Sequence, residues 1–186
     1  MSLKVCELPR SFFVSIFLIF WMPYSLVYGA EYYGSAVLGV SDVELSGVVP
    51  EEFDAELSYG IRLGWGFSEK FSTGILINKF ISDEGLNSEL DVLNVLFELS
   101  YFTGHRLRNS FWAGALVGWS EVDADSSPSP SSSFESSDFS LGAIMGYQFR
   151  LNNMTTLGPQ VVYLRIFRGS GEITEITGQG NFTFWF

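Results

Sequence analysis

Apolar and polar residues alternate along most of the chain after residue 30, most clearly from Phe53 to Phe67. Every second residue of that stretch is apolar, and the residues between are acidic, serine, arginine or glycine. Eight apolar residues with a period of two cannot line one face of a helix, but they do line one face of a β-strand. A stretch this long exceeds the usual strand of a soluble protein and suits a tilted strand that crosses a membrane.

The same period recurs seven more times, so the pattern predicts eight strands. The other series are Tyr32–Val40, Phe71–Ile77, Leu93–Tyr101, Phe111–Trp119, Phe139–Phe149, the less regular Thr155–Phe167, and Ile176–Phe186. The predicted fold class is all-β, an eight-stranded antiparallel up-and-down transmembrane β-barrel. Closure would leave no unpaired strand edge in lipid.

The predicted connections alternate in length. The long ones are 42–52, 82–90, 122–137 and 168–174, and the short ones are 68–70, 103–106 and 150–153. Membrane barrels have short periplasmic turns and longer outer loops, so this alternation predicts both barrel termini in the periplasm. The loop at 122–137 is rich in serine and proline, which favours a solvated surface loop, with a binding tip as the alternative.

Residues 1–30 predict a secretory signal peptide. Lys4 and Arg10 flank its start, an apolar run covers Phe12–Met22, and small residues near Gly29 and Ala30 mark a cleavage site at about residue 29 or 30. The mature domain would then be 31–186, a single barrel. An uncleaved anchor helix remains the alternative, because this segment could just span a bilayer.

Charge and side-chain chemistry narrow the functional classes. The net charge of -11 argues against a nucleic-acid partner. The only cysteine, Cys6, lies in the segment expected to be removed, and no phosphate-binding loop or metal-ligand spacing appears, so no cofactor, metal or catalytic residue is predicted.

An enzymatic barrel that modifies lipid A would need a histidine beside a serine at the outer leaflet. The only histidine, His105, falls in a predicted periplasmic turn, so we do not expect an enzyme. A hydrolase that uses the carboxylates of Asp54, Glu56 and Glu121 is left open.

Glycines and serines occupy the face opposite the apolar series, which suits the narrow interior of an eight-stranded barrel. Arg62 and Glu98 fall on that face at similar depth. We expect a lumen ion pair between them, which Arg108 could join, because a buried charge is costly unless it is paired. A proton or ion path is the functional alternative.

Two basic residues are predicted near the outer rim. Lys79 and Arg165 would project outward there, where their side chains could contact the phosphates of lipopolysaccharide. The register of the seventh strand is ambiguous, so Arg165 could instead lie inside.

The signal segment, the eight alternating strands and the final residues Phe182, Thr183, Phe184, Trp185 and Phe186 resemble the small outer-membrane barrels of the OmpX and OmpA type. The resemblance implies a monomer in the bacterial outer membrane, in contact with lipid and lipopolysaccharide. It also implies that Phe182, Phe184 and Phe186 form the signal read by the barrel-assembly machinery, although Gly178 and Gly180 depart from the usual bulky residues.

A fold of this kind hosts many functions. The predicted function is a structural or surface-interaction role through the extracellular loops. One alternative is a narrow porin-like route for small apolar compounds. Another is a soluble lipocalin-like ligand carrier, whose apolar set would point inward around its ligand.

Overall fold

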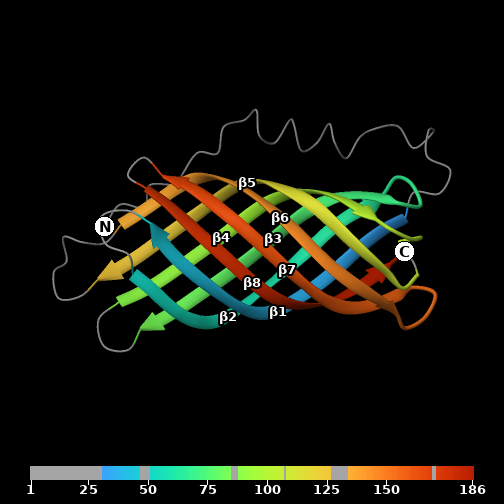
Figure 1. The fold of residues 1–186 in the computed structure, drawn as a ribbon, viewed down its shortest axis with the longest axis horizontal. Coiled ribbons are helices and arrows are strands. Elements are labelled where there is room, and N and C mark those ends of the chain that lie inside the picture. Colours follow the sequence, from blue (N-terminus) through green and yellow to red (C-terminus); the bar gives the residue numbers. More distant parts are fainter. Residues whose placement is uncertain (1–30, 47–50, 85–87, 107, 127–133, 169–170) are drawn as a thin grey trace, which may run out of the picture.

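Eight antiparallel strands close into one barrel in the computed structural model, which confirms the predicted fold class (Figure 1). The structure describes residues 31–46, 51–84, 88–106, 108–126, 134–168 and 171–186, so the predicted signal peptide at 1–30 lies outside the described residues. The strands are β1 (Glu31–Ser46), β2 (Glu51–Gly66), β3 (Phe71–Glu84), β4 (Ser88–Phe102), β5 (Ser110–Ser126), β6 (Phe134–Arg150), β7 (Thr155–Arg168) and β8 (Gly171–Trp185).

Each strand pairs with its neighbours in sequence, and β8 closes the barrel against β1. That closing ladder runs from Tyr33 opposite Trp185 to Ser46 opposite Glu172. Every described strand therefore has a partner on both sides, which satisfies the backbone hydrogen bonds that an open sheet edge would leave unpaired. In the described part of the chain, no helix is long and apolar enough to cross a membrane.

The strands extend well beyond the stretches that the alternation marked. The β5–β6 ladder reaches Ala124 opposite Phe134, and the β7–β8 ladder reaches Arg168 opposite Gly171. The long connections predicted at 42–52, 82–90, 122–137 and 168–174 are therefore too long, and most of their residues belong to strands. Strand pairing depends on backbone hydrogen bonds, so it continues where neither face of a hairpin needs apolar side chains.

The two ends of the barrel differ in the strands that they connect. We call the end with connections 67–70, 103–109 and 151–154 the turn end, and the opposite end, where the strands pass into 47–50, 85–87, 127–133 and 169–170, the hairpin end. The predicted contrast in connection length is not observed. The turn at 103–109 is longer than the predicted 103–106. Connection length therefore does not tell which end of the barrel faces the periplasm.

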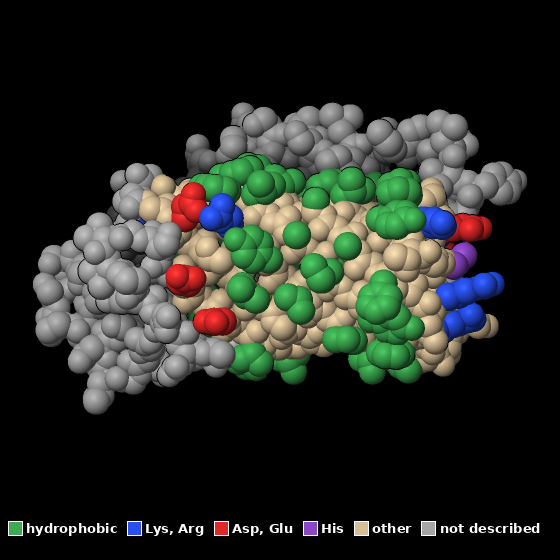
Figure 2. Space-filling model, in the orientation of Figure 1, with side chains coloured by type: hydrophobic (Ala, Val, Ile, Leu, Met, Phe, Trp, Pro, Cys, Tyr) green, Lys and Arg blue, Asp and Glu red, His purple; other side chains and the backbone are tan. Residues whose placement is uncertain are grey.

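The alternation separates an apolar outer face from a packed interior. Among residues with described side chains, thirty large hydrophobic side chains are exposed, and they include Ile61, Phe97 and Leu141. Figure 2 shows such side chains distributed over the visible outer surface. The predicted apolar set thus points outward, which contradicts the carrier alternative, in which it would surround an internal ligand.

The interior is filled by large side chains that lie over glycines of neighbouring strands. A Cβ atom added to Gly64 would lie 2.8 Å from the ring of Tyr33, and one added to Gly146 would lie 3.0 Å from the ring of Trp112. Tyr33 and Trp112 are both almost fully buried. This alternation of large and small residues is how a narrow barrel fills its interior with side chains.

Candidate functional site

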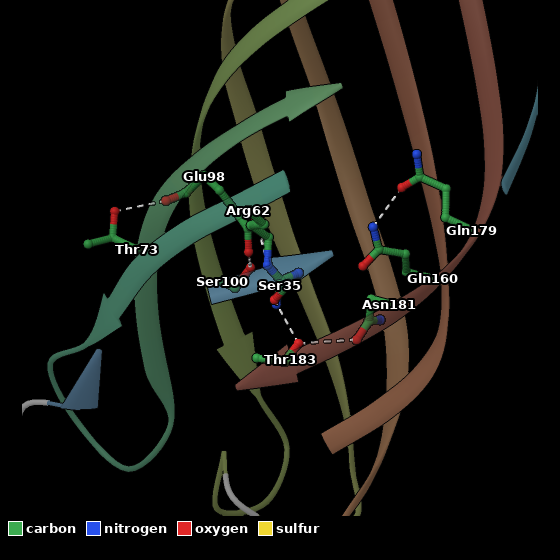
Figure 3. A network of polar contacts seen from close by, with 9 residues as sticks. All are labelled: Ser35, Arg62, Thr73, Glu98, Ser100, Gln160, Gln179, Asn181 and Thr183. Carbon is green, nitrogen blue, oxygen red and sulfur yellow. Dashed lines mark hydrogen bonds and ion pairs between the residues drawn. The ribbon is translucent and has the colours of Figure 1, made fainter. Parts of the chain in front are cut away.

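A buried charge pair lies in the interior near the turn end. Arg62 on β2 and Glu98 on β4 are 2% and 0% exposed, and Arg62 Nε lies 3.6 Å from Glu98 Oε2. The Ser100 hydroxyl donates to the Glu98 carboxylate, and the Thr73 hydroxyl donates to the Glu98 carbonyl oxygen at 2.8 Å. Figure 3 shows Arg62, Glu98 and Ser100 close together inside the barrel, with Thr73 on the other side of Glu98.

Two aromatic rings complete the environment of Arg62. Its Cζ atom lies 4.6 Å from the centroid of the Trp112 ring and 5.1 Å from that of Tyr33. Arg62 Nε has no hydrogen bond, so the interaction with Glu98 is an ion pair without a direct hydrogen bond. The guanidinium is therefore held by one carboxylate and the faces of two rings, an arrangement that stabilises a buried cation.

Arg108 does not join this pair, contrary to the predicted third member, because its side chain is exposed in the turn at 103–109. The buried arginine of that turn is Arg106, which is 3% exposed and lies 3.1 Å from the Glu31 carboxylate. Its guanidinium also donates to the Ser68 carbonyl oxygen and occupies the space left by Gly66. The turn thus places the Arg106 side chain in the buried end of the barrel. The sequence pattern does not indicate this, because turn residues lack periodicity.

A second buried carboxylate, Glu175 on β8, lies among neutral donors. Its oxygens accept hydrogen bonds from Thr177 at 2.7 Å, Asn94 at 2.9 Å and Ser41 at 3.3 Å. No ion pair of Glu175 is found among the described residues. Asn94 belongs to β4, which stands opposite β8 in the ring of eight strands, so this contact crosses the interior. Glu175 was not among the residues predicted from the sequence.

A third polar group also joins distant strands. Gln160 on β7 donates to Gln179 on β8 at 2.7 Å, and Gln179 donates to Asn78 on β3 at 3.0 Å and to Ser58 on β2 at 3.1 Å. Figure 3 shows the bond between the two glutamines. These groups satisfy one another across the interior, which also contains leucines at 0% exposure such as Leu76 and Leu116. The arrangement suits a sealed core rather than a reaction centre.

The two basic residues predicted near the outer rim lie at the hairpin end and point outward, which resolves the register of β7. Lys79 Nζ lies 2.8 Å from the Asp91 carboxylate, and Arg165 Nη2 lies 3.3 Å from that of Glu172. Each basic side chain therefore already has a carboxylate neighbour.

The last strand presents Phe182, Phe184 and Phe186 on the outer face, all exposed. Phe186 exchanges two backbone hydrogen bonds of 2.9 Å with Tyr32, and their rings stack with centroids 6.4 Å apart. The C-terminus is thus fixed to the first strand at the turn end.

The residues considered for enzymatic chemistry do not form a described cluster. His105 is half-buried in the turn at 103–109, and Glu121 is exposed on the outer face near the hairpin end. The side chains of Asp54 and Glu56 lie outside the described residues. Among the side chains that are described, no three His, Cys, Asp or Glu residues are grouped so that they could hold a metal ion.

Comparison with known proteins identifies the fold alone. No protein-family model matches the chain, and no curated protein matches it in sequence. Among solved structures, Neisserial surface protein A is similar with a TM-score of 0.70 at 12% identity, covering 85% of this chain and 99% of that one. The outer membrane protein OprG from Pseudomonas aeruginosa gives a TM-score of 0.60 at 15% identity, covering 85% and 96%.

The attachment invasion locus protein Ail of Yersinia pestis, in complex with the heparin analogue sucrose octasulfate, gives a TM-score of 0.53 at 13% identity. The match covers 83% of this chain and 99% of that one. The chain thus has the fold of the small eight-stranded outer-membrane β-barrels.

Proposed function

We propose that this chain is an exported protein of the bacterial outer membrane that serves as a closed, monomeric scaffold and presents its hairpin end at the cell surface. The observation that carries the proposal is the outer face, where thirty large hydrophobic side chains are exposed among the described residues. Soluble monomers rarely expose apolar patches beyond a few hundred Å². A belt around a closed barrel is instead what lipid requires.

The distribution of charge supports an outward hairpin end. Four segments at that end, 42–56, 79–91, 121–138 and 165–172, contain sixteen of the 21 acidic residues and three of the ten basic ones. The turn end has the opposite balance, and on the visible face Figure 2 shows mainly acidic side chains towards one end and mainly basic ones towards the other. The surface that meets other molecules would therefore be strongly anionic, and it favours cationic partners or divalent ions over polyanions.

Contact with lipopolysaccharide through Lys79 and Arg165 stays a prediction. A phosphate would have to displace Asp91 or Glu172 from these side chains, since both ion pairs are already formed. We therefore expect neutralisation of either basic residue to change lipopolysaccharide binding only slightly.

Transport through the lumen is the weaker candidate. The interior contains fully buried leucines and three polar groups that link different strands, so a passage for small apolar compounds would require several of these contacts to break together. Flux assays in liposomes test this directly, and we expect no leakage of glucose-sized or small aromatic solutes above that of empty liposomes.

The experiment that tests the main proposal is expression of the full chain in a Gram-negative host, followed by separation of the inner and outer membranes. We expect recovery in the outer membrane, a change in gel mobility between unboiled and boiled samples, and an N-terminus near residue 30. A product that stays soluble without detergent, or that remains in the inner membrane with its N-terminus intact, would overturn the proposal. Surface labelling of a cysteine introduced near residue 130 then tests the orientation.

A further inference from the structure

Several polar atoms around the buried charge pair have no hydrogen-bond partner, although their side chains are almost fully enclosed. The atoms are Tyr33 Oη, Arg62 Nε and Nη1, Ser72 Oγ and Glu98 Oε2. Each of these four side chains is at most 2% exposed. Buried donors and acceptors without a partner are uncommon in folded proteins, so a concentration of them in one place needs a cause.

The four side chains form one cluster. Arg62 Nε lies 3.6 Å from Glu98 Oε2, and Arg62 Cζ lies 5.1 Å from the centroid of the Tyr33 ring. The Tyr33 hydroxyl is also close to the Ser72 hydroxyl and to the Arg62 guanidinium, without the geometry of a hydrogen bond to either. A Cβ atom added to Gly74, the ladder partner of Glu98, would lie 2.7 Å from the Tyr33 hydroxyl oxygen. The hydroxyl therefore lies over the backbone of β3, beside the charge pair.

The polar network around Glu175 shows that this interior can satisfy its own buried groups. Both oxygens of that carboxylate accept hydrogen bonds. Asn94 donates to it and accepts from Ser120, whose hydroxyl also bonds that of Ser140. None of these four residues contributes an unpartnered buried atom. The unpartnered atoms of the Arg62 cluster are therefore a local feature, which the Glu175 network does not share.

The charges of the cluster limit what could join it. Arg62 and Glu98 carry opposite charges, so the cluster has no net charge that would attract an ion. A cation would lie against the guanidinium, an anion would lie against the carboxylate, and an added charge is costly in a buried site. A neutral molecule that both donates and accepts hydrogen bonds suits these atoms, because Arg62 offers donors, Glu98 Oε2 offers an acceptor and the two hydroxyls offer both.

The spacing of the charged atoms suits a molecule with a single heavy atom. A separation of 3.6 Å is too long for a direct hydrogen bond, but one oxygen atom beside the pair can lie about 2.8 Å from both Nε and Oε2. Figure 3 shows Arg62 inside the barrel beside Glu98 and Ser35, its ladder partner on β1. The rings of Tyr33 and Trp112 lie against the guanidinium and leave little room for a larger solute.

We propose that an ordered water molecule is part of this cluster, bound between Arg62 Nε and Glu98 Oε2 and within reach of the Tyr33 and Ser72 hydroxyls. The charge pair is then linked through water, as polar contacts longer than about 3.5 Å often are. Buried waters typically make about three hydrogen bonds to groups that would otherwise be unpaired, and the cluster offers that many. The site depends on the barrel fold, so its test is separate from that of the proposed membrane location.

The test is solution NMR of the folded protein in detergent micelles, with cross-relaxation from water measured at side-chain N–H groups. Arg62 Nε–H should show a cross peak with the sign of a long-lived bound water. The side-chain amide of Asn94 is the control within the same molecule, because it is 1% exposed, donates to Glu175 and lies beside the Ser120 hydroxyl. It should show no such peak, and proton exchange through hydroxyl groups would affect both positions.

Three variants distinguish a bound water from exchange at a neighbouring hydroxyl. Tyr33→Phe and Ser72→Ala each remove one hydroxyl and should keep the Arg62 peak, because Nε and Oε2 still hold the water. Arg62→Met combined with Glu98→Leu removes both of these atoms without leaving a lone buried charge. Oxygen-17 relaxation dispersion of this double variant should show the loss of a long-lived water. Leu96→Met, an interior change that conserves volume, should show no loss.

Several results would overturn the site. One is the absence of a water peak at Arg62 Nε–H, and another is an equal peak at the Asn94 amide. Loss of the peak in Tyr33→Phe or in Ser72→Ala would identify an exchanging hydroxyl as its source. An unchanged dispersion in the double variant would place the long-lived waters elsewhere. Each variant is first checked for its heat-dependent gel shift, and the peak in the parent protein decides the question if the double variant does not fold.

Discussion

Replacing Glu98 with glutamine should destabilise the barrel, because it leaves the charge of Arg62 buried without a counter-charge. The two groups are 3.6 Å apart and almost wholly buried. At an effective dielectric constant of 20, unit charges at that distance attract by about 4–5 kcal/mol. Glutamine keeps the shape of the side chain and can still interact with Ser100, and the Trp112 and Tyr33 rings still face the guanidinium. We therefore expect a loss of about 3 kcal/mol, at the lower end of the range for breaking a buried pair.

The assay is denaturant unfolding of the barrel refolded in detergent micelles, followed by tryptophan fluorescence and by the gel shift. A double-mutant cycle with Arg62→Met separates the pair from its surroundings, because methionine fills similar space without charge. The double variant should lose no more than about 1 kcal/mol, since replacing both members of a buried pair is often close to neutral. Glu121→Gln, an exposed outward change, is the control and should fall within about 0.5 kcal/mol of the parent.

The ion pair does not stabilise the barrel if Glu98→Gln costs less than about 0.5 kcal/mol, or if the losses from the two single variants simply add in the double variant. Either result would mean that the aromatic rings alone stabilise the guanidinium. In that case, Trp112→Leu in the Glu98→Gln background should lower the free energy of unfolding by more than Glu98→Gln does alone.

Three further predictions address packing, assembly and the outer surface. Gly64→Val should prevent formation of the heat-shifted barrel, because its Cβ would lie 2.2 Å from the Thr73 carbonyl oxygen and 2.8 Å from the Tyr33 ring, whereas Gly178→Val, with no atom within 4 Å, should be tolerated. Deletion of Phe186 should reduce the folded fraction in the outer membrane in cell fractionation, through loss of its two hydrogen bonds to Tyr32 as well as of the predicted assembly signal. Sucrose octasulfate should not bind intact cells that carry the barrel at physiological salt, because the end proposed to face outward is anionic; binding above that of cells without the barrel would refute the charge argument.

The number of strands, and which residues of each strand point outward, were predictable because successive residues of a barrel strand face alternately the outer apolar phase and the packed interior. Apolar residues at every second position, as in Phe53 to Phe67, directly reflect contact with an apolar phase on one side. The strand ends at the hairpin end were not predictable in the same way. Ala124 and Phe134 pair through backbone hydrogen bonds where the alternation has already stopped, so a hydrophobic pattern underestimates their length.

The interior was predictable only in part, for a related reason. Arg62 and Glu98 occupy the inward face at depths that follow from counting along two strands. By contrast, Arg106 enters the interior from a turn, where no period assigns a face, and Arg108 two residues later stays outside. Glu175 has no charged neighbour among the described residues, and its donors Thr177, Asn94 and Ser41 come from three different strands. That combination depends on the shear of the closed barrel and cannot be inferred from one strand at a time.

The packing of the interior limits where this protein can act. The bond between Asn94 and Glu175 joins opposite strands, and the bond between Gln179 and Asn78 spans three positions around the ring. Opening a route through the lumen would break both at once and leave buried polar groups unpaired, at about 1–3 kcal/mol for each group. Changes on the outer face or beyond the hairpin end break neither bond. Any activity that involves another molecule is therefore more readily built on those surfaces than in the lumen. Because acidic residues are concentrated at the hairpin end and basic residues at the turn end, the two ends attract ions of opposite charge.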